Sequence, residues 1–141
     1  MTPHRVIVAS WAGSVAFVPL VLAAVFVEGL RPAAALVSTL LFAVGVGVFF
    51  WAYAIAVGRS RTDAIGIGGL FFLAGDVAPS RERRHLMGSL VLQTITALGA
   101  ASARPFTSLA FGVLAPLYGL ATAGLWGARY GRFGRRPDRR R

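Results

Sequence analysis

The residues of this chain that could carry acid–base or metal chemistry are few and scattered. Cysteine is absent, and no two acids or histidines have the spacing of a metal site or of an acid–base pair. The sequence therefore predicts a protein that is not an enzyme, with no catalytic residue, no metal and no cofactor. The acids and histidines in question are Glu28, Asp63, Asp76, Glu82, Asp138, His4 and His85.

Transport coupled to protons is also disfavoured by these positions. Such carriers place an ionisable residue in the middle of the membrane, and none of the acids lies there. The motif GIGG at residues 66–69 lacks the third glycine of a dinucleotide-binding fingerprint, and no strand precedes it. Gln93 and Thr96 are polar residues within an apolar stretch. They are expected to hydrogen-bond between helices, with a substrate contact as the alternative.

Long apolar blocks show that the elements positioning these residues are membrane spans. Only 14% of the residues are charged and 56% are hydrophobic, whereas a soluble domain usually has about a quarter charged. Residues 6–27 and 33–58 contain no charge, and residues 86–128 contain only Arg104. A helix needs about 20 apolar residues to cross the hydrocarbon core of a bilayer. The first two blocks are therefore one span each, and the third is long enough for two.

Arg104 divides the third block, because Pro105 follows it and an Arg-Pro pair favours a turn before a new helix. The first block is longer than the apolar core of a signal peptide, so it is read as a retained helix. We expect an all-α polytopic membrane protein with four transmembrane helices arranged as two hairpins. The expected spans are about 6–27, 33–58, 86–103 and 106–128. They form one bundle over residues 1–128, and a basic cytoplasmic tail follows at 129–141.

The glycine-rich segment at residues 64–79 is expected to touch the membrane without crossing it. Its apolar part, residues 64–75, would reach only about 18 Å as a helix. A longer crossing would enclose Asp76 and Pro79, and an extended one would leave backbone groups unpaired in lipid. We therefore expect an interfacial or re-entrant segment in the inner leaflet.

The net charge of +10 comes from 15 basic residues, all of them arginine. With four spans and a cytoplasmic N-terminus, every arginine except Arg31 and Arg104 lies on the cytoplasmic side, as the positive-inside rule requires. Membrane topology thus explains the charge without a nucleic acid partner. The same clusters predict contact with the anionic headgroups of the lipid bilayer. The residues concerned are Arg81, Arg83, Arg84, Arg129, Arg132, Arg135 and Arg136.

Small residues recur at every fourth position of the span 106–128. Such a stripe lies on one face of a helix and lets a neighbouring backbone approach closely. Two roles stay open: packing within the bundle, or docking another subunit. The four residues are Ala115, Gly119, Ala123 and Gly127.

The second half of the chain resembles a group of small uncharacterised membrane proteins of actinobacteria. The similar pieces are FFLAG-x-x-AP with the arginine cluster that follows it, ARPFTSLAFGVLAP, and GLWGARYG. The resemblance implies an inner-membrane location, and it transfers neither an activity nor a catalytic residue.

These features predict a small non-catalytic protein of the cell inner membrane, with several spans and both termini in the cytoplasm. Its expected role is an accessory or assembly subunit of a cell-envelope complex, either as a homo-oligomer or with another membrane protein. The alternative is a small dimeric carrier or polyprenyl-lipid flippase. For that alternative, Gln93 and Arg104 are the candidate substrate contacts.

Overall fold

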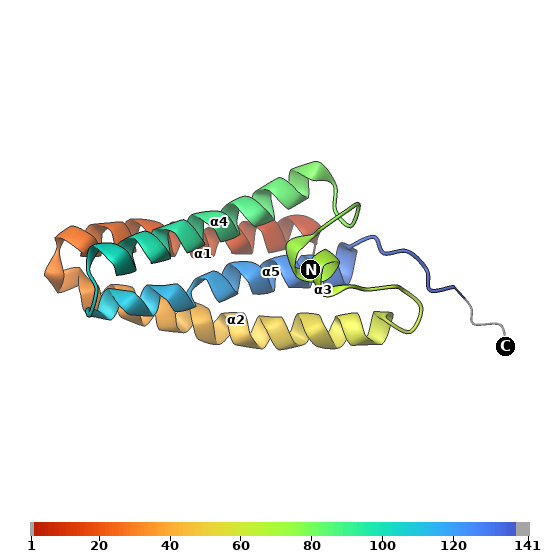
Figure 1. The fold of residues 1–141 in the computed structure, drawn as a ribbon, viewed down its shortest axis with the longest axis horizontal. Coiled ribbons are helices and arrows are strands. Elements are labelled where there is room, and N and C mark those ends of the chain that lie inside the picture. The colour runs from red at the N-terminus through yellow and green to blue at the C-terminus, as the bar shows by residue number, and fades with distance from the viewer. Residues whose placement is uncertain (1, 138–141) are drawn as a thin grey trace.

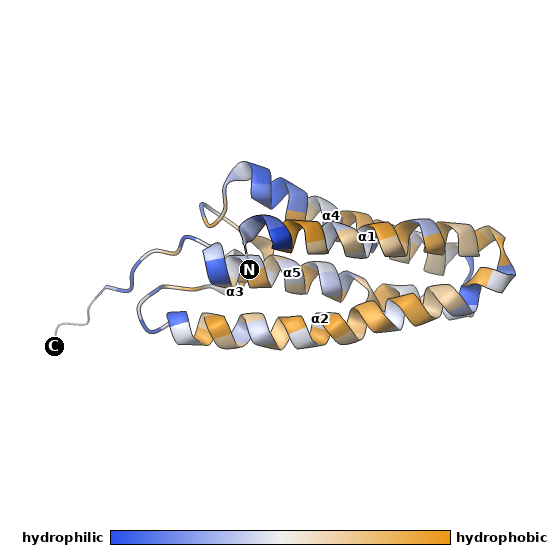
Figure 2. Cartoon of the chain, turned by 180° about the vertical axis from the view of Figure 1, so that it is seen from behind, coloured by the Kyte–Doolittle hydropathy of each residue, from blue (hydrophilic) through white to orange (hydrophobic). Residues whose placement is uncertain are grey.

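The structure, a computed structural model, describes residues 2–137. Met1 and residues 138–141, which include Asp138 and the end of the predicted basic tail, lie outside the described residues. The part that is described folds entirely into helices and connecting loops, without strands. Four stretches are long and apolar enough to cross a membrane: Pro3–Phe26, Glu28–Arg59, Ser80–Ala103 and Ser108–Tyr130. The predicted all-α fold with four candidate spans is therefore confirmed. The hydrophilic residues gather toward the two ends of the bundle (Figure 2).

The elements follow one another along the chain as five α-helices and two short 3₁₀-helices (Figure 1). They are α1 (Pro3–Phe26), η1 (Glu28–Leu30), α2 (Arg31–Arg59), α3 (Ile67–Phe72), α4 (Ser80–Ala103), η2 (Ser108–Leu114) and α5 (Pro116–Tyr130).

Two helix boundaries differ from the predicted ones. Helix α4 begins at Ser80, not near residue 86, because polar residues such as those at 80–85 form helix readily once they lie outside the hydrocarbon. The predicted fourth span is not one continuous α-helix. It starts as the 3₁₀-helix η2, and α5 begins only at Pro116. Proline has no N–H to continue the helical ladder but suits a first helical turn, so the break falls there.

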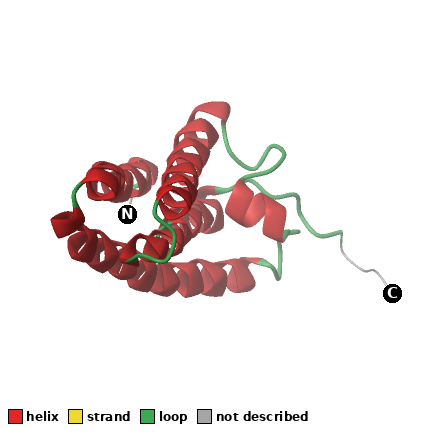
Figure 3. Ribbon diagram, turned by 60° about the vertical axis from the view of Figure 1, so that its left-hand side comes forward, coloured by secondary structure: helices red, strands yellow, loops and turns green. Residues whose placement is uncertain are grey.

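Helix α5 lies at the centre of the bundle. Every residue from 121 to 128 is buried, and the helix contacts α1, α2, α3 and α4 (Figures 1 and 3). The most extensive contacts pair α2 with α5, followed equally by α1 with α4 and α2 with η2. Each of these pairs joins an element of the first half of the chain to one of the second half.

Close approach between α2 and α5 depends on Gly45. A Cβ atom at this position would lie 2.9 Å from the backbone nitrogen of Tyr118 and 3.2 Å from the carbonyl carbon of Leu117. Without a hydrophobic drive between helices in lipid, such backbone contact is a main source of helix association.

The arginines of the two Arg-Pro turns meet at the C-terminus of α1. Arg31 donates from Nε to the carbonyl oxygen of Ala24 at 3.4 Å, and Arg104 donates from Nε to that of Val25 at 3.1 Å. The last carbonyls of a helix have no intrahelical donor, and cations are favourable beside them. Glu28 pairs with Arg31 at 3.5 Å, so both arginines have defined partners at this end.

Candidate functional site

The glycine-rich segment folds back against α5 as the short helix α3. Glycines of α5 make the room for it: a Cβ atom at Gly127 would collide with the carbonyl oxygen of Leu70, and one at Gly124 with the ring of Phe71. Leu70 and Phe71 are buried by this contact. Helix α3 ends at Phe72, and the next residue, Leu73, takes the left-handed conformation (φ 51°) and lets the chain turn away. The glycine-rich segment thus packs against the last turns of α5.

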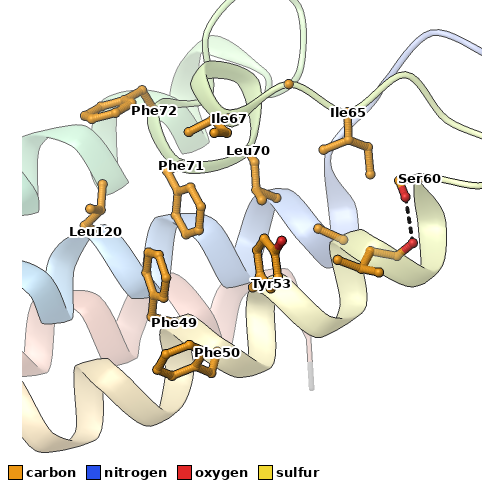
Figure 4. A pocket seen from close by; sticks show the side chains of 13 residues that line it. Phe49, Phe50, Tyr53, Ser60, Ile65, Ile67, Leu70, Phe71, Phe72 and Leu120 are labelled. Atoms are coloured by element: carbon orange, nitrogen blue, oxygen red, sulfur yellow. Dashed lines mark hydrogen bonds between the residues drawn. The ribbon is translucent and has the colours of Figure 1, made fainter.

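An apolar pocket of about 410 Å³ opens where α3 meets α2 (Figure 4). This size falls within the range of small-molecule and cofactor sites. Phe49 and Phe71 stack in its wall with ring centroids 4.7 Å apart. The larger lining side chains are Phe49, Phe50, Tyr53 and Val57 of α2, Ile65, Ile67, Leu70, Phe71 and Phe72 of the glycine-rich segment, and Leu120 of α5.

The chemistry of this pocket is almost purely apolar. The polar side chains that line it are Tyr53 and Ser60, and the Ser60 hydroxyl already donates to the carbonyl oxygen of Val57 at 2.7 Å. No acid, base or histidine contributes to the lining. The pocket can therefore hold hydrocarbon, and its polar contacts are limited to the hydroxyls of Tyr53 and Ser60.

Arg59, the last residue of α2, holds the glycine-rich segment to the bundle. Its Nη2 donates to Oδ2 of Asp63 at 2.9 Å, and its Nη1 donates to the carbonyl oxygen of Ala128 at 2.7 Å. Nη2 also reaches the carbonyl oxygen of Gly131 at 3.1 Å, and the guanidinium lies 5.5 Å from the ring centroid of Phe133. One side chain thus joins α2, the start of the loop and the end of α5.

The residues after α5 pair with the same loop. The amide of Ala64 donates to the carbonyl of Gly134 at 2.8 Å, and that of Arg132 donates to the carbonyl of Val77 at 2.9 Å. The amide of Arg136 donates to the carbonyl of Thr62 at 3.0 Å. The described part of the predicted tail is therefore hydrogen-bonded along residues 132–136 to the glycine-rich segment and to Thr62 just before it.

A cluster of buried polar side chains joins α1 to α4. Ser10 donates to Oγ of Ser89 at 2.9 Å, the hydroxyls of Ser14 and Ser89 lie 2.8 Å apart, and Nε2 of Gln93 donates to Ser14 at 2.9 Å. All four side chains are at most 1% exposed. The predicted interhelical hydrogen bond of Gln93 is present.

The corresponding expectation for Thr96 was wrong. Its side chain is buried, but it makes no hydrogen bond to another helix among residues 2–137. Along α1, the buried residue one turn beyond the serine cluster is Phe17, which offers no acceptor side chain.

Gln93 and Arg104 do not form a common substrate site. Gln93 is fully buried within the serine cluster, whereas Arg104 is exposed at the end of α4 on the carbonyl of Val25. Eleven residues of helix separate them, which is about 16 Å.

The small-residue stripe of α5 lies inside the bundle. Ala115 and Ala123 are fully buried. A Cβ atom at Gly119 would come within 3.0 Å of Oε1 of Gln93 and 3.2 Å of Cα of Leu90, both on α4. Gly127 faces the backbone of α3. The stripe is thus covered by α3 and α4 of the same chain.

The seven arginines predicted to contact lipid headgroups are all exposed. Arg81, Arg83 and Arg84 lie in the first turns of α4, at the same end of the bundle as the end of α5 (Figure 1). Arg129 lies over the ring of Trp51, 4.8 Å from its centroid. The others, Arg132, Arg135 and Arg136, follow α5 in the segment whose backbone pairs with the loop.

Sequence reasoning missed the role of Arg59 and the pocket beside it. The signal for Arg59 was present, because Asp63 follows it by four residues, the spacing of an ion pair on one helical turn. The pocket had no comparable signal, since its wall combines residues from three separate elements. Comparisons with models of protein families, with curated proteins and with solved structures found no match to this chain. A proposal for its function therefore rests on the geometry of its sites.

Proposed function

We propose that this is a non-catalytic four-span membrane protein that binds the hydrocarbon chain of a membrane lipid in the pocket between α2, α3 and α5. The observation that carries the proposal is the composition of the pocket wall, which is aromatic and aliphatic over nearly its whole surface. A hydrocarbon chain is the one abundant ligand in a bilayer that needs no polar partner.

The position of the pocket along α2 supports a lipid of the inner leaflet. The α2 residues that line it run from Phe49 to Ser60, about 17 Å back from the end of the helix. This depth matches one leaflet, since the whole hydrocarbon core is about 30 Å thick. In the orientation that we propose, with two hairpins and both termini in the cytoplasm, this end of the bundle faces the cytoplasm, and the glycine-rich segment lies in the inner leaflet without crossing.

The other predicted roles have weaker support. An accessory-subunit role rested on the stripe of α5 as a docking face, and α3 and α4 of the same chain cover that stripe. A polyprenyl-lipid flippase would share chain binding with our proposal, but its two candidate contacts, Gln93 and Arg104, lie apart.

Filling the pocket should abolish lipid capture. Val57 lines it and is half exposed, so Val57→Trp should occupy the space of the chain without disturbing the core. We expect labelling by a phospholipid with a photoreactive acyl chain to fall about tenfold, with labelled peptides of the wild type at residues 49–57 and 65–72.

Ala54→Trp is the matched control, because Ala54 is an exposed residue of the same helix that does not line the pocket. It should label like the wild type. Equal labelling of all three proteins, or labelling spread evenly over every lipid-facing helix, would mean that only annular lipid is present and would overturn the proposal.

The proposed topology makes a separate prediction. With no native cysteine, Ser60→Cys and Ser80→Cys should both be protected from a membrane-impermeant thiol reagent in intact cells, while Ser102→Cys at the other end should react. All three should react once the membrane is opened. Reaction of Ser80→Cys but not of Ser60→Cys in intact cells would show that the segment between them crosses.

A further inference from the structure

A second groove, of about 910 Å³, lies between the first turns of α1 and α4. No helix that lines the apolar pocket contributes to it, so the two sites are independent. Its lining changes character along its length. The chain's start and the first turns of α4 supply polar side chains, whereas the rest of the α1 face is apolar.

The polar end of the groove combines N–H donors with a carboxylate, and these groups are not hydrogen-bonded within the described residues. Arg81, His4 and His85 supply N–H donors, and Glu82 supplies a carboxylate. Among the described residues, none of these four side chains makes a hydrogen bond or an ion pair, and Oε2 of Glu82 is buried without one. Arg81 and Glu82 are neighbours in sequence, yet they are not paired with each other.

The backbone adds to the positive potential here. The N-cap of α4 is Pro79, whose side chain cannot accept a hydrogen bond from the free N–H groups of the first turn. The partial positive charge at a helix N-terminus favours a negative group, and a basic side chain beside it adds its own positive charge. Arg81 occupies that place in the groove.

The apolar end of the groove follows one face of α1. From His4 to Val15 the lining residues recur at helical spacing, a distance of about 16 Å along the axis. Trp11 lies midway, with its ring edge-to-face against His85 at 6.4 Å between centroids. An indole between a polar and an apolar region is typical of the headgroup level of a membrane. The apolar lining residues are Ile7, Val8, Trp11, Ala12 and Val15.

We propose that this groove is a binding site for one molecule of phosphatidylethanolamine. The phosphate lies between Arg81 and the two histidines, and an acyl chain follows α1 past Ala12 to Val15. The carboxylate of Glu82 receives the ammonium group of the headgroup. A purely anionic headgroup would leave that carboxylate facing a negative ligand, whereas a headgroup with one charge of each sign matches both halves of the polar end.

The test uses the full chain, purified in detergent and stripped of lipid, then offered equal amounts of phosphatidylethanolamine and phosphatidylglycerol with identical chains. Native mass spectrometry counts the lipid that stays bound. Since Val57→Trp fills the apolar pocket, the lipid is counted in that background. We expect one retained phosphatidylethanolamine, and a loss of about tenfold in its retention when Arg81→Gln is added. Glu82→Gln should remove the preference for ethanolamine over glycerol, because the ammonium loses its partner while the phosphate keeps its own.

Two matched controls separate this site from general attraction. Arg84 is exposed on the same turns of α4 and does not line the groove, so Arg84→Gln should retain lipid like the wild type. Ala12→Phe should block the acyl chain, whereas Ala16→Phe, one turn further on the exposed surface of α1, should not. All five positions are at least partly exposed, and unchanged melting temperatures would show that the variants fold.

Four results would overturn the inference. Equal losses in Arg81→Gln and Arg84→Gln would indicate diffuse surface charge. A preference for phosphatidylglycerol, or an ethanolamine preference that survives Glu82→Gln, would exclude the proposed headgroup. Equal retention by Ala12→Phe and Ala16→Phe would exclude the chain path. Val57→Trp, which fills the other pocket, leaves this groove intact, so the two proposals fail separately.

Discussion

Replacing Gly45 with valine is expected to force α2 away from α5 and to lower the free energy of unfolding by about 3 kcal/mol. The new side chain would meet the backbone of Tyr118, whose nitrogen would lie 2.9 Å and whose Cα would lie 3.0 Å from the added Cβ. A clash with a flexible side chain can be relieved by a new rotamer. A clash with helical backbone can be relieved only by moving a helix.

Gly47→Val is the control for this prediction. Gly47 lies in the same helix two residues later, and an added Cβ would have no neighbour within 4 Å. Both variants change helix propensity by the same amount, so only the contact differs. Thermal unfolding in detergent should show a lower melting temperature for Gly45→Val alone. Equal melting temperatures for the two variants would mean that α2 and α5 are not in backbone contact.

Arg59→Gln is expected to release the glycine-rich segment and the residues after α5 together. The change removes the ion pair with Asp63 and the donors to the carbonyls of Ala128 and Gly131. The Asp63 side chain is only 19% exposed, so its carboxylate would be left partly buried without a cation. Because both partners keep some contact with solvent, we expect a cost of about 2 kcal/mol, below that of a fully buried pair.

Hydrogen exchange is the sharpest measurement of this release. The amides of Ala64, Arg132 and Arg136 bridge the two segments, and their exchange should accelerate about tenfold or more in Arg59→Gln. Arg61→Gln, at an exposed arginine two residues away, should leave the exchange unchanged. Arg59→Lys keeps the charge but lacks the planar fork that reaches three acceptors, so it should behave more like Arg59→Gln than like the wild type. Unaltered exchange in Arg59→Gln would show that the loop is held by its apolar contacts alone.

Hydropathy was sufficient to predict the four candidate spans, because the cost of burying charge in lipid is large and depends little on detail. The same property could not locate the start of α4. Residues 80–85 are polar but helical, and hydropathy reports the edge of the hydrocarbon, which is not the edge of the helix. Pro116 marks in the sequence a position where an α-helix can begin. The sequence does not show whether the residues before it pack as a 3₁₀-helix, which they do in the structure.

The candidate sites were less predictable than the fold. A spacing of four residues places Gly119 and Gly127 on one face of a helix, yet it does not say which neighbour covers that face. Here α4 covers one and α3 covers the other. The apolar pocket has residues from α2, α3 and α5, and the groove has residues from α1 and α4. Each site forms only when helices distant in sequence pack together, so no local sequence pattern could predict it.

The pairing of α1 with α4 bears on how the protein is made. Ser14 and its partner Gln93 are 79 residues apart in the chain. At about 5 to 20 residues per second, a ribosome needs on the order of 4 to 16 s to add that length. During this interval the first half is already in the bilayer while the partners of its buried hydroxyls are still unsynthesised. Ser14 has a temporary acceptor in its own helix, the carbonyl oxygen of Ser10 at 3.4 Å. The nascent first span can therefore stay in lipid with this hydroxyl paired, and the hydrogen bonds to Ser89 and Gln93 are added when α4 is inserted.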